Sequence, residues 1–192
     1  MFDWKKALIL SVVGVPLLVV GCAKKEEAPA PAPVVEEAAA PEPMTAVAVL
    51  QPRGDLTLTG SVTFTQVGDT VTIAAHVEGV TPGKHGFHLH ELGDCSAEDF
   101  TSTGGHFNPT DAPHGGPDDR VRHAGDFGNI EVGEDGTGHV ELTSDMITVA
   151  AGPNTVVGRA IILHEGEDDL ESQPTGAAGG RIACGVVAPP GG

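Results

Sequence analysis

The residues with the clearest capacity for chemistry are two histidines in the segment 86–90. His88 and His90 are separated by one residue. Alternate residues of an extended strand face the same side, so both imidazoles project from one face while Phe87 and Leu89 face the other. Imidazole is the commonest metal donor in proteins. A single pair of this kind also fits rings that are solvated or hydrogen-bonded to backbone groups. The pair is therefore consistent with a metal site but does not establish one.

Further potential ligands follow along the chain. His106, His114 and His123 lie in one loop, Asp126 comes three residues after the last of them, and His164 ends a later apolar run. Imidazoles with one carboxylate suit zinc or copper. Six histidines and an aspartate exceed the four ligands of one tetrahedral site. The count therefore indicates two metal ions or a shared ligand.

The elements that must position these residues read as short strands. Apolar alternation with period two, broken by turn residues, recurs over 46–50, 56–66, 71–77, 86–90, 130–132, 139–143, 146–149, 160–164 and 181–187. With 27 Gly, 15 Pro and few aromatic residues, this pattern predicts an all-β sandwich or barrel. The segments 93–129 and 165–180 are too long for ordinary connections, which is typical of functional loops.

The net charge of -17 arises from acidic residues spread over most of the chain. Such a charge argues against nucleic acid or an anionic lipid surface as the main partner, because both repel it. We interpret the acidity mainly as a source of solubility.

The N-terminus predicts export. Lys5 and Lys6 precede an apolar run over 7–20, and the tetrapeptide Val19-Val20-Gly21-Cys22 resembles the bacterial lipobox, in which cleavage precedes a cysteine that carries lipid. An uncleaved membrane anchor is the alternative. The run is shorter than the roughly 20 residues of a membrane-spanning helix and contains Pro16, which favours the lipoprotein.

This interpretation divides the chain into three parts: a lipoprotein signal peptide over 1–21, a tether rich in Ala, Pro and Glu over 22–44, and one β domain over 45–192. The tether has no helical or strand period. We expect lipid on Cys22 to hold the protein to the membrane on the periplasmic side. Ala23, in place of an aspartate, favours the outer membrane.

Three cysteines are present, and lipid on Cys22 leaves Cys95 and Cys184 as a pair. In an oxidising compartment an even pair predicts a disulfide between them. Two separate buried thiols are the alternative, which export disfavours.

Several motifs occur in an order that resembles the copper-zinc superoxide dismutase family over about 46–188. They are the segments 86–94, Gly105-His106-Phe107-Asn108-Pro109, His114-Gly115-Gly116-Pro117, Arg122-His123-Ala124-Gly125-Asp126 and 179–187. The resemblance implies an eight-stranded Greek-key β-barrel of the immunoglobulin-like sandwich type with two long functional loops. It also implies that the protein removes superoxide from the cell envelope.

The resemblance implies two metal sites that share His106. The copper ligands would be His88, His90, His106 and His164. The zinc ligands would be His106, His114, His123 and Asp126. In this family copper changes oxidation state and zinc does not, and the shared imidazole carries a proton. Superoxide would leave as dioxygen and hydrogen peroxide.

Two further residues match positions of the family. Arg181 corresponds to the arginine that holds superoxide beside copper, and an always-charged guanidinium suits a small anion. Asp168 corresponds to the aspartate that links a copper histidine, here His88, to a zinc histidine, here His114. Asp168 lies in an acidic run, so a solvated charge is the alternative there.

The chain departs from the family before Arg181, where the segment 171–175 is short and has no lysine to attract the anion. The resemblance leaves a homodimer open. The alternative to an enzyme is a copper- or zinc-binding protein of the same fold without activity. The presence of all four copper positions and of Arg181 favours the enzyme.

Overall fold

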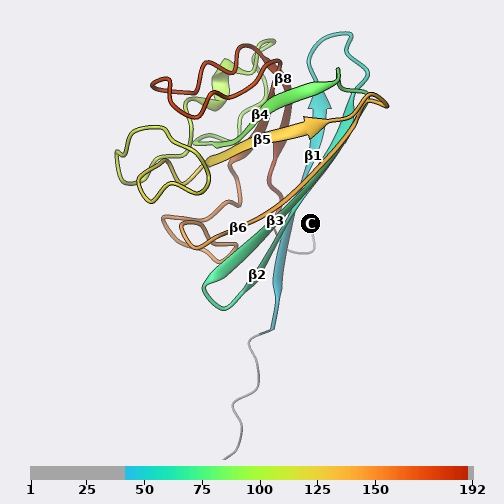
Figure 1. Cartoon of the computed structure of the whole chain (residues 1–192). Coiled ribbons are helices and arrows are strands. Elements are labelled where there is room, and N and C mark those ends of the chain that lie inside the picture. Colours follow the sequence, from blue (N-terminus) through green and yellow to red (C-terminus); the bar gives the residue numbers. More distant parts are fainter. Residues whose placement is uncertain (1–41, 190–192) are drawn as a thin grey trace, which may run out of the picture. The chain divides into compact units, whose positions relative to one another are not determined.

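Eight antiparallel strands close into one barrel in the computed structural model, which describes residues 42–189 (Figure 1). The strands are β1 (Met44–Pro52), β2 (Thr59–Val67), β3 (Thr70–Glu78), β4 (Gly83–His90), β5 (Asp126–Val132), β6 (Thr137–Ser144), β7 (Ala160–His164) and β8 (Arg181–Val186). Their order around the barrel is β1-β2-β3-β6-β5-β4-β7-β8, and β8 pairs with β1. The predicted all-β, eight-stranded Greek-key barrel is confirmed. The signal peptide and Cys22 lie outside the described residues.

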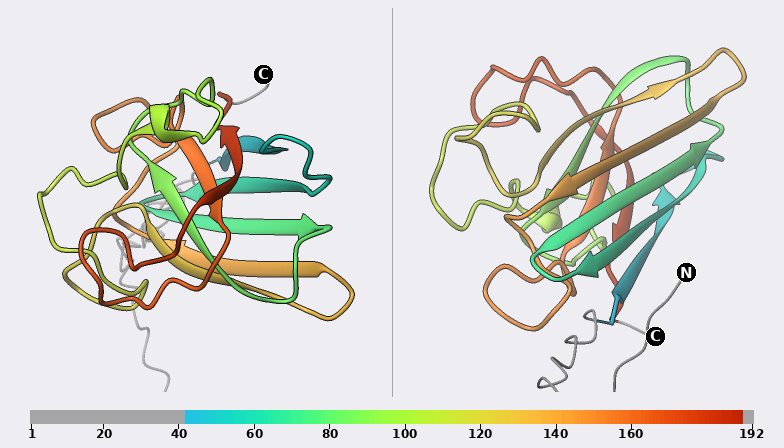
Figure 2. Two further views of the ribbon diagram at one scale, coloured as in Figure 1. Left: turned by 90° about the horizontal axis from the view of Figure 1, so that it is seen from above. Right: turned by 60° about the horizontal axis from the view of Figure 1, so that its bottom comes forward.

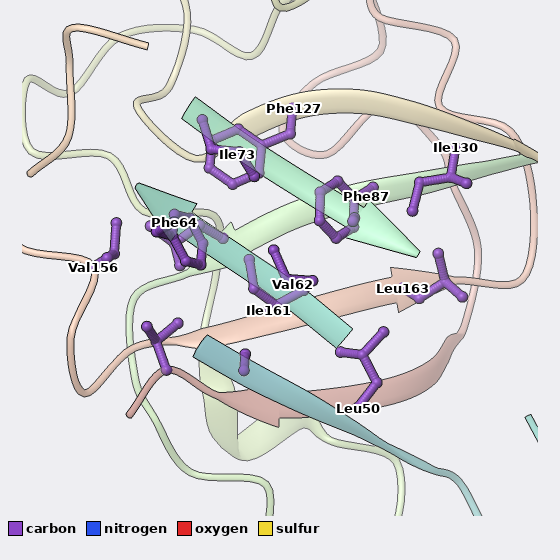
Figure 3. Packing of buried hydrophobic residues seen from close by; sticks show 14 of the residues in the cluster. Leu50, Val62, Phe64, Ile73, Phe87, Phe127, Ile130, Val156, Ile161 and Leu163 are labelled. Atoms are coloured by element: carbon purple, nitrogen blue, oxygen red, sulfur yellow. The ribbon is translucent and has the colours of Figure 1, made fainter. Parts of the chain in front are cut away.

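The hydrophobic core fills the inside of the barrel. In β2 and β3 burial alternates with the period of a strand, so that Val62, Phe64 and Ile73 face inward. The rings of Phe64 and Phe87 pack on either side of Phe127, with centroids 6.5 Å and 5.7 Å from its own (Figure 3). Among residues 42–189, no helix is both long and apolar enough to cross a bilayer.

Strand β4 is buried on both faces, which sets it apart from β2 and β3. Phe87 and Leu89 belong to the core, whereas His88 and His90 point outward and are nevertheless 0% exposed. Two long loops, 91–125 and 165–180, cover them from outside, and the ribbon shows these loops side by side (Figures 1 and 2). The alternation of β4 therefore gives one strand a core face and a histidine face.

A disulfide between Cys95 and Cys184 ties the first long loop to β8, as predicted. Cys184 is fully buried beside Phe100, Ala160 and Ile162. With a sequence separation of 89 residues, the chain-entropy relation gives about 4.5 kcal/mol of stabilisation against the unfolded chain. The disulfide thus fixes the start of a loop that carries several histidines.

The prediction of a strand over 146–149 is wrong. Ile147 and Val149 are buried, but the segment makes only an isolated bridge, between Thr148 and Thr155. The Oε1 atom of Gln66 accepts hydrogen bonds from the backbone N–H groups of Val149 at 2.7 Å and Ala150 at 3.2 Å. Here a side chain satisfies the backbone that a neighbouring strand would otherwise satisfy. The apolar alternation of 146–149 therefore reflects burial of a loop and not a strand.

Candidate metal centre

Four histidines converge outside the barrel beneath the two loops. His88 and His90 come from β4, His164 from the end of β7 and His106 from the loop 91–125. One ring nitrogen from each lies within 4.8 Å of the others, and all four residues are buried. We call this group the first cluster.

Each histidine of the first cluster has one buried nitrogen without a hydrogen-bond partner among the described residues. These atoms are His88 Nδ1, His90 Nε2, His106 Nε2 and His164 Nε2. A buried polar atom without a partner is unfavourable, so four of them at one point mark a place for something that binds them. Nitrogen lone pairs aimed at one point fit a transition-metal ion.

The other ring nitrogen of each histidine is held by an oxygen atom. The pairs are His88 Nε2 with Asp168 Oδ2 at 2.7 Å, His90 Nδ1 with the Gly104 carbonyl at 3.0 Å, His106 Nδ1 with Asp126 Oδ1 at 2.7 Å and His164 Nδ1 with the Gly179 carbonyl at 3.2 Å. A carbonyl or carboxylate oxygen fixes both the orientation of a ring and the nitrogen that carries the proton. The free nitrogens are therefore set to accept a metal.

A second cluster surrounds the carboxylate of Asp126. The Nδ1 atoms of His106, His114 and His123 lie 2.7, 3.0 and 3.1 Å from its Oδ1 atom. Tetrahedral zinc, with bonds of about 2.0–2.1 Å to nitrogen, would separate neighbouring ligand atoms by roughly 3.3 Å. The four groups thus need only small movements to fit such an ion. His106 joins the two clusters, since Nε2 belongs to the first and Nδ1 to the second.

Burial keeps the first cluster neutral. It lowers the pKa of His88 to about 3 and that of His164 to about 4, and it also lowers the pKa values of His90 and His106. Neutral imidazole is the form that binds a metal, so these rings need not lose a proton at neutral pH.

The second cluster, in contrast, stabilises charged groups. Burial alone would lower the pKa of His114, but the neighbouring carboxylates of Asp126 and Asp168 raise it to about 9. Burial likewise opposes ionisation of Asp126, yet the neighbouring rings of His106 and His114 hold the pKa of its carboxyl well below the usual range. A site with these carboxylates favours a cation, and a metal ion satisfies that preference in place of a proton.

Asp168 connects the two clusters from the loop 165–180. Its carboxylate lies 2.7 Å from His88 Nε2 and 3.0 Å from His114 Nε2, and it is 1% exposed. Gly176 has φ +68°, and a Cβ atom there would collide with the Asp168 carboxylate. Only glycine suits both requirements at this position.

Two residues that hold this arrangement were missed by sequence reasoning. The amide of Asn129 donates to the Asp168 carbonyl at 2.9 Å and accepts from its N–H at 2.8 Å. The amide of Gln173 does the same with the backbone of His114, at 2.9 and 2.8 Å. A polar residue in the middle of β5 is the one signal that could have identified Asn129.

Arg181 begins β8 and pairs with His164 in the ladder of β7 and β8. Its guanidinium donates to the Phe100 carbonyl at 2.6 Å, Thr103 Oγ1 at 2.7 Å and the Gly104 carbonyl at 2.8 Å. Gly104 and Thr103 also contact His90, so Arg181 lies next to the first cluster. Three of its five N–H groups are used within the described residues, which leaves Nε–H and one N–H of Nη2 for an anion.

The barrel and its two joined clusters define a metalloprotein with adjacent sites for two transition-metal ions. The sequence profile described as "Copper/zinc superoxide dismutase (SODC)" matches residues 58–187. The extracellular superoxide dismutase [Cu-Zn] of Brugia pahangi is 44% identical over 153 residues, which are 75% of each chain. A crystal structure of the clock protein EA4 superposes with a TM-score of 0.69 at 42% identity and covers 76% of this chain and 94% of that one.

The chain belongs to the copper/zinc superoxide dismutase family. It is an oxidoreductase that converts superoxide to dioxygen and hydrogen peroxide, and its cofactors are copper and zinc. A metal-binding protein of the same fold without activity is therefore not retained as an alternative.

Proposed function

We propose that the first cluster holds copper and the second holds zinc. The observation that carries this assignment is the set of four unpartnered nitrogens in the first cluster, set against the carboxylate at the centre of the second. Four neutral imidazoles suit copper, whereas three imidazoles and a carboxylate suit zinc. Bound copper supplies the one-electron redox chemistry, and bound zinc holds the loop and polarises the shared ring.

The side chains around the first cluster bind superoxide and provide a group that can carry a proton to it. Arg181 offers two free N–H groups to superoxide, and its position is fixed by its bonds to the segment 100–104. His106 would accept and release one proton at Nε2, the nitrogen that faces the first cluster, while its Nδ1 stays on the side of the second cluster. Burial of the surrounding rings restricts water, so the charge of Arg181 acts in a medium of low dielectric constant.

The assignment is tested by Asp126→Asn. We expect zinc bound per chain, measured by mass spectrometry of the metals, to fall from one equivalent to near zero, because the neutral amide removes the charge that favours the cation. Zinc affinity should fall by at least about 100-fold, whereas copper should remain near one equivalent. The exposed Asp145→Asn is the matched control. Zinc retained at one equivalent in Asp126→Asn would remove Asp126 from the site.

The location of the enzyme is also a proposal. An apolar signal over 1–21, lipid on Cys22 and a tether over 22–44 would place the domain over 45–192 in the periplasm, held to the outer membrane. The extracellular name of the Brugia pahangi relative supports export. The resemblance of Val19-Val20-Gly21-Cys22 to a lipobox supports the lipid anchor. In this position the enzyme would protect the cell envelope from superoxide.

Cys22→Ser tests the anchor in a Gram-negative host. The unaltered protein should sediment with outer membranes and carry acyl chains by mass spectrometry, and Cys22→Ser should be soluble because no thiol remains to accept lipid. Ala23→Asp is the control, since it keeps the lipid and should move the protein to the inner membrane. Sedimentation of Cys22→Ser with the outer membrane would contradict the proposal.

A homodimer through the outer face of β1 and β8 completes the proposal. Val47, Val49 and Val186 are 41%, 60% and 41% exposed, and the register of β1 with β8 sets Val49 opposite Val186. Exposed apolar side chains in one place favour burial against another surface. Light scattering should give the mass of two chains, reduced to one by Val49→Lys.

A further inference from the structure

Two histidines lie outside both clusters on the outer face of the barrel. All nine histidines of the chain belong to the described residues, and seven of them are buried. Six of those form the clusters. The seventh, His85, has its ring nitrogens 2.9 and 2.8 Å from the carbonyl oxygens of His164 and Thr81. His76 and His139 are the two exposed histidines.

These two residues face each other across the sheet. His76 of β3 is paired directly with His139 of β6 in a regular antiparallel ladder that runs over 71–78 and 137–144 (Figure 1). Directly opposite residues project to the same face, with Cβ atoms about 4.5–5.5 Å apart. The residues directly before and after each histidine on its strand face the other side of the sheet, which is the barrel interior. The two imidazoles therefore share one patch of outer surface.

A carboxylate is already in contact with one of the rings. Glu78 lies two residues after His76 on the same face, and its Oε1 atom is 3.0 Å from His76 Nε2. This contact leaves Nδ1 of His76 available. The ring of His139 has no side-chain hydrogen bond or ion pair within 42–189, and Glu141 follows it at the same two-residue spacing on that face. The two nitrogen donors thus lie between two carboxylates on this face, Glu78 on one side of the pair along β3 and Glu141 on the other side along β6.

We infer that His76 and His139 form a surface chelate for a divalent transition-metal cation, with Glu78 orienting the ring of His76. Imidazole pairs of this kind suit Zn²⁺, Ni²⁺ and Cu²⁺. Both side chains are exposed, so rotation about their side-chain bonds suffices to bring the nitrogens to one ion. The net charge of -17 raises the concentration of cations around the protein. The inference is independent of the metal assignment in the buried clusters.

Ni²⁺ titration of the full copper- and zinc-loaded enzyme by calorimetry tests the site. We expect one further equivalent to bind, and His76→Ala and His139→Ala should each weaken it by at least about tenfold, because a single ring cannot chelate. The double variant should weaken binding little beyond either single variant. Asp55→Asn, which removes an exposed carboxylate outside β3 and β6, should bind as the unaltered enzyme does. Equal affinity in a single histidine variant would overturn the inference.

Paramagnetic broadening provides a second readout that does not depend on the variants. One equivalent of Ni²⁺ should broaden the ring resonances of His76 and His139 together in the loaded enzyme. Broadening of only one of them, or of neither, would show that no chelate forms. Dismutation by both histidine variants should equal that of the unaltered enzyme, which verifies that the barrel is intact.

Discussion

Replacing His164 with alanine is expected to remove copper and to lower superoxide dismutation at least about 100-fold. His164 contributes one of four unpartnered nitrogens of the first cluster, and its ring is fixed by the Gly179 carbonyl. Three ligands in a site built for four leave the ion with an open position and weaker binding. The measurements are copper per chain and the rate of superoxide consumption at equal protein concentration.

The matched control is His139→Ala, which makes the same chemical change on the outer face of the barrel. It should leave the copper content and the rate unchanged. A fully active His164→Ala enzyme would show that the first cluster is not the copper site. If His164→Ala lost all activity but kept its copper, His164 would act on the binding or reaction of superoxide and would not be needed to hold the metal.

Replacing Arg181 with alanine is expected to lower kcat/KM by roughly 10- to 100-fold at low ionic strength with both metals retained. Arg181 lies beside the first cluster and is a fixed positive charge in a strongly acidic protein. The short segment 171–175 has no lysine to share this role. The rate of the unaltered enzyme should therefore fall as salt screens this charge, and that of Arg181→Ala should vary less.

Two variants separate charge from structure. Arg181→Lys keeps the charge and should recover part of the rate and most of the salt dependence, although lysine cannot reproduce the three bonds to the segment 100–104. The exposed Arg120→Ala should resemble the unaltered enzyme. An unaltered enzyme whose rate is the same at low and high salt would contradict the steering role of Arg181.

The barrel was predictable because its strands alternate with period two and its turns carry glycine and proline. The disulfide could be predicted by counting the cysteines of a chain whose N-terminus predicts export. The structure of the segment 146–149 was not predictable, because the distant side chain of Gln66, and not a neighbouring strand, accepts hydrogen bonds from its backbone. A strand and a buried loop share the same apolar pattern when the partner of the backbone is far away in sequence.

The candidate site divides in the same way. Spacing alone grouped the histidines with Asp126, and the resemblance added the roles of Arg181 and Asp168. Asn129 and Gln173 were not found, because each holds a neighbour through backbone atoms, and such bonds depend on how two loops meet rather than on any local motif. Residues that act through the backbone of others leave little trace in one sequence.

The two-sided burial of β4 has a consequence for the lifetime of the enzyme. The same strand anchors Phe87 in the core and His88 in the first cluster, so an ion held there binds the folded chain alone. Binding to the folded chain alone stabilises that state by an amount that grows with the logarithm of the free metal concentration once it exceeds the dissociation constant. Metal supply would thus set how often the loops 91–125 and 165–180 open to proteases, and an underloaded population would turn over faster than a filled one.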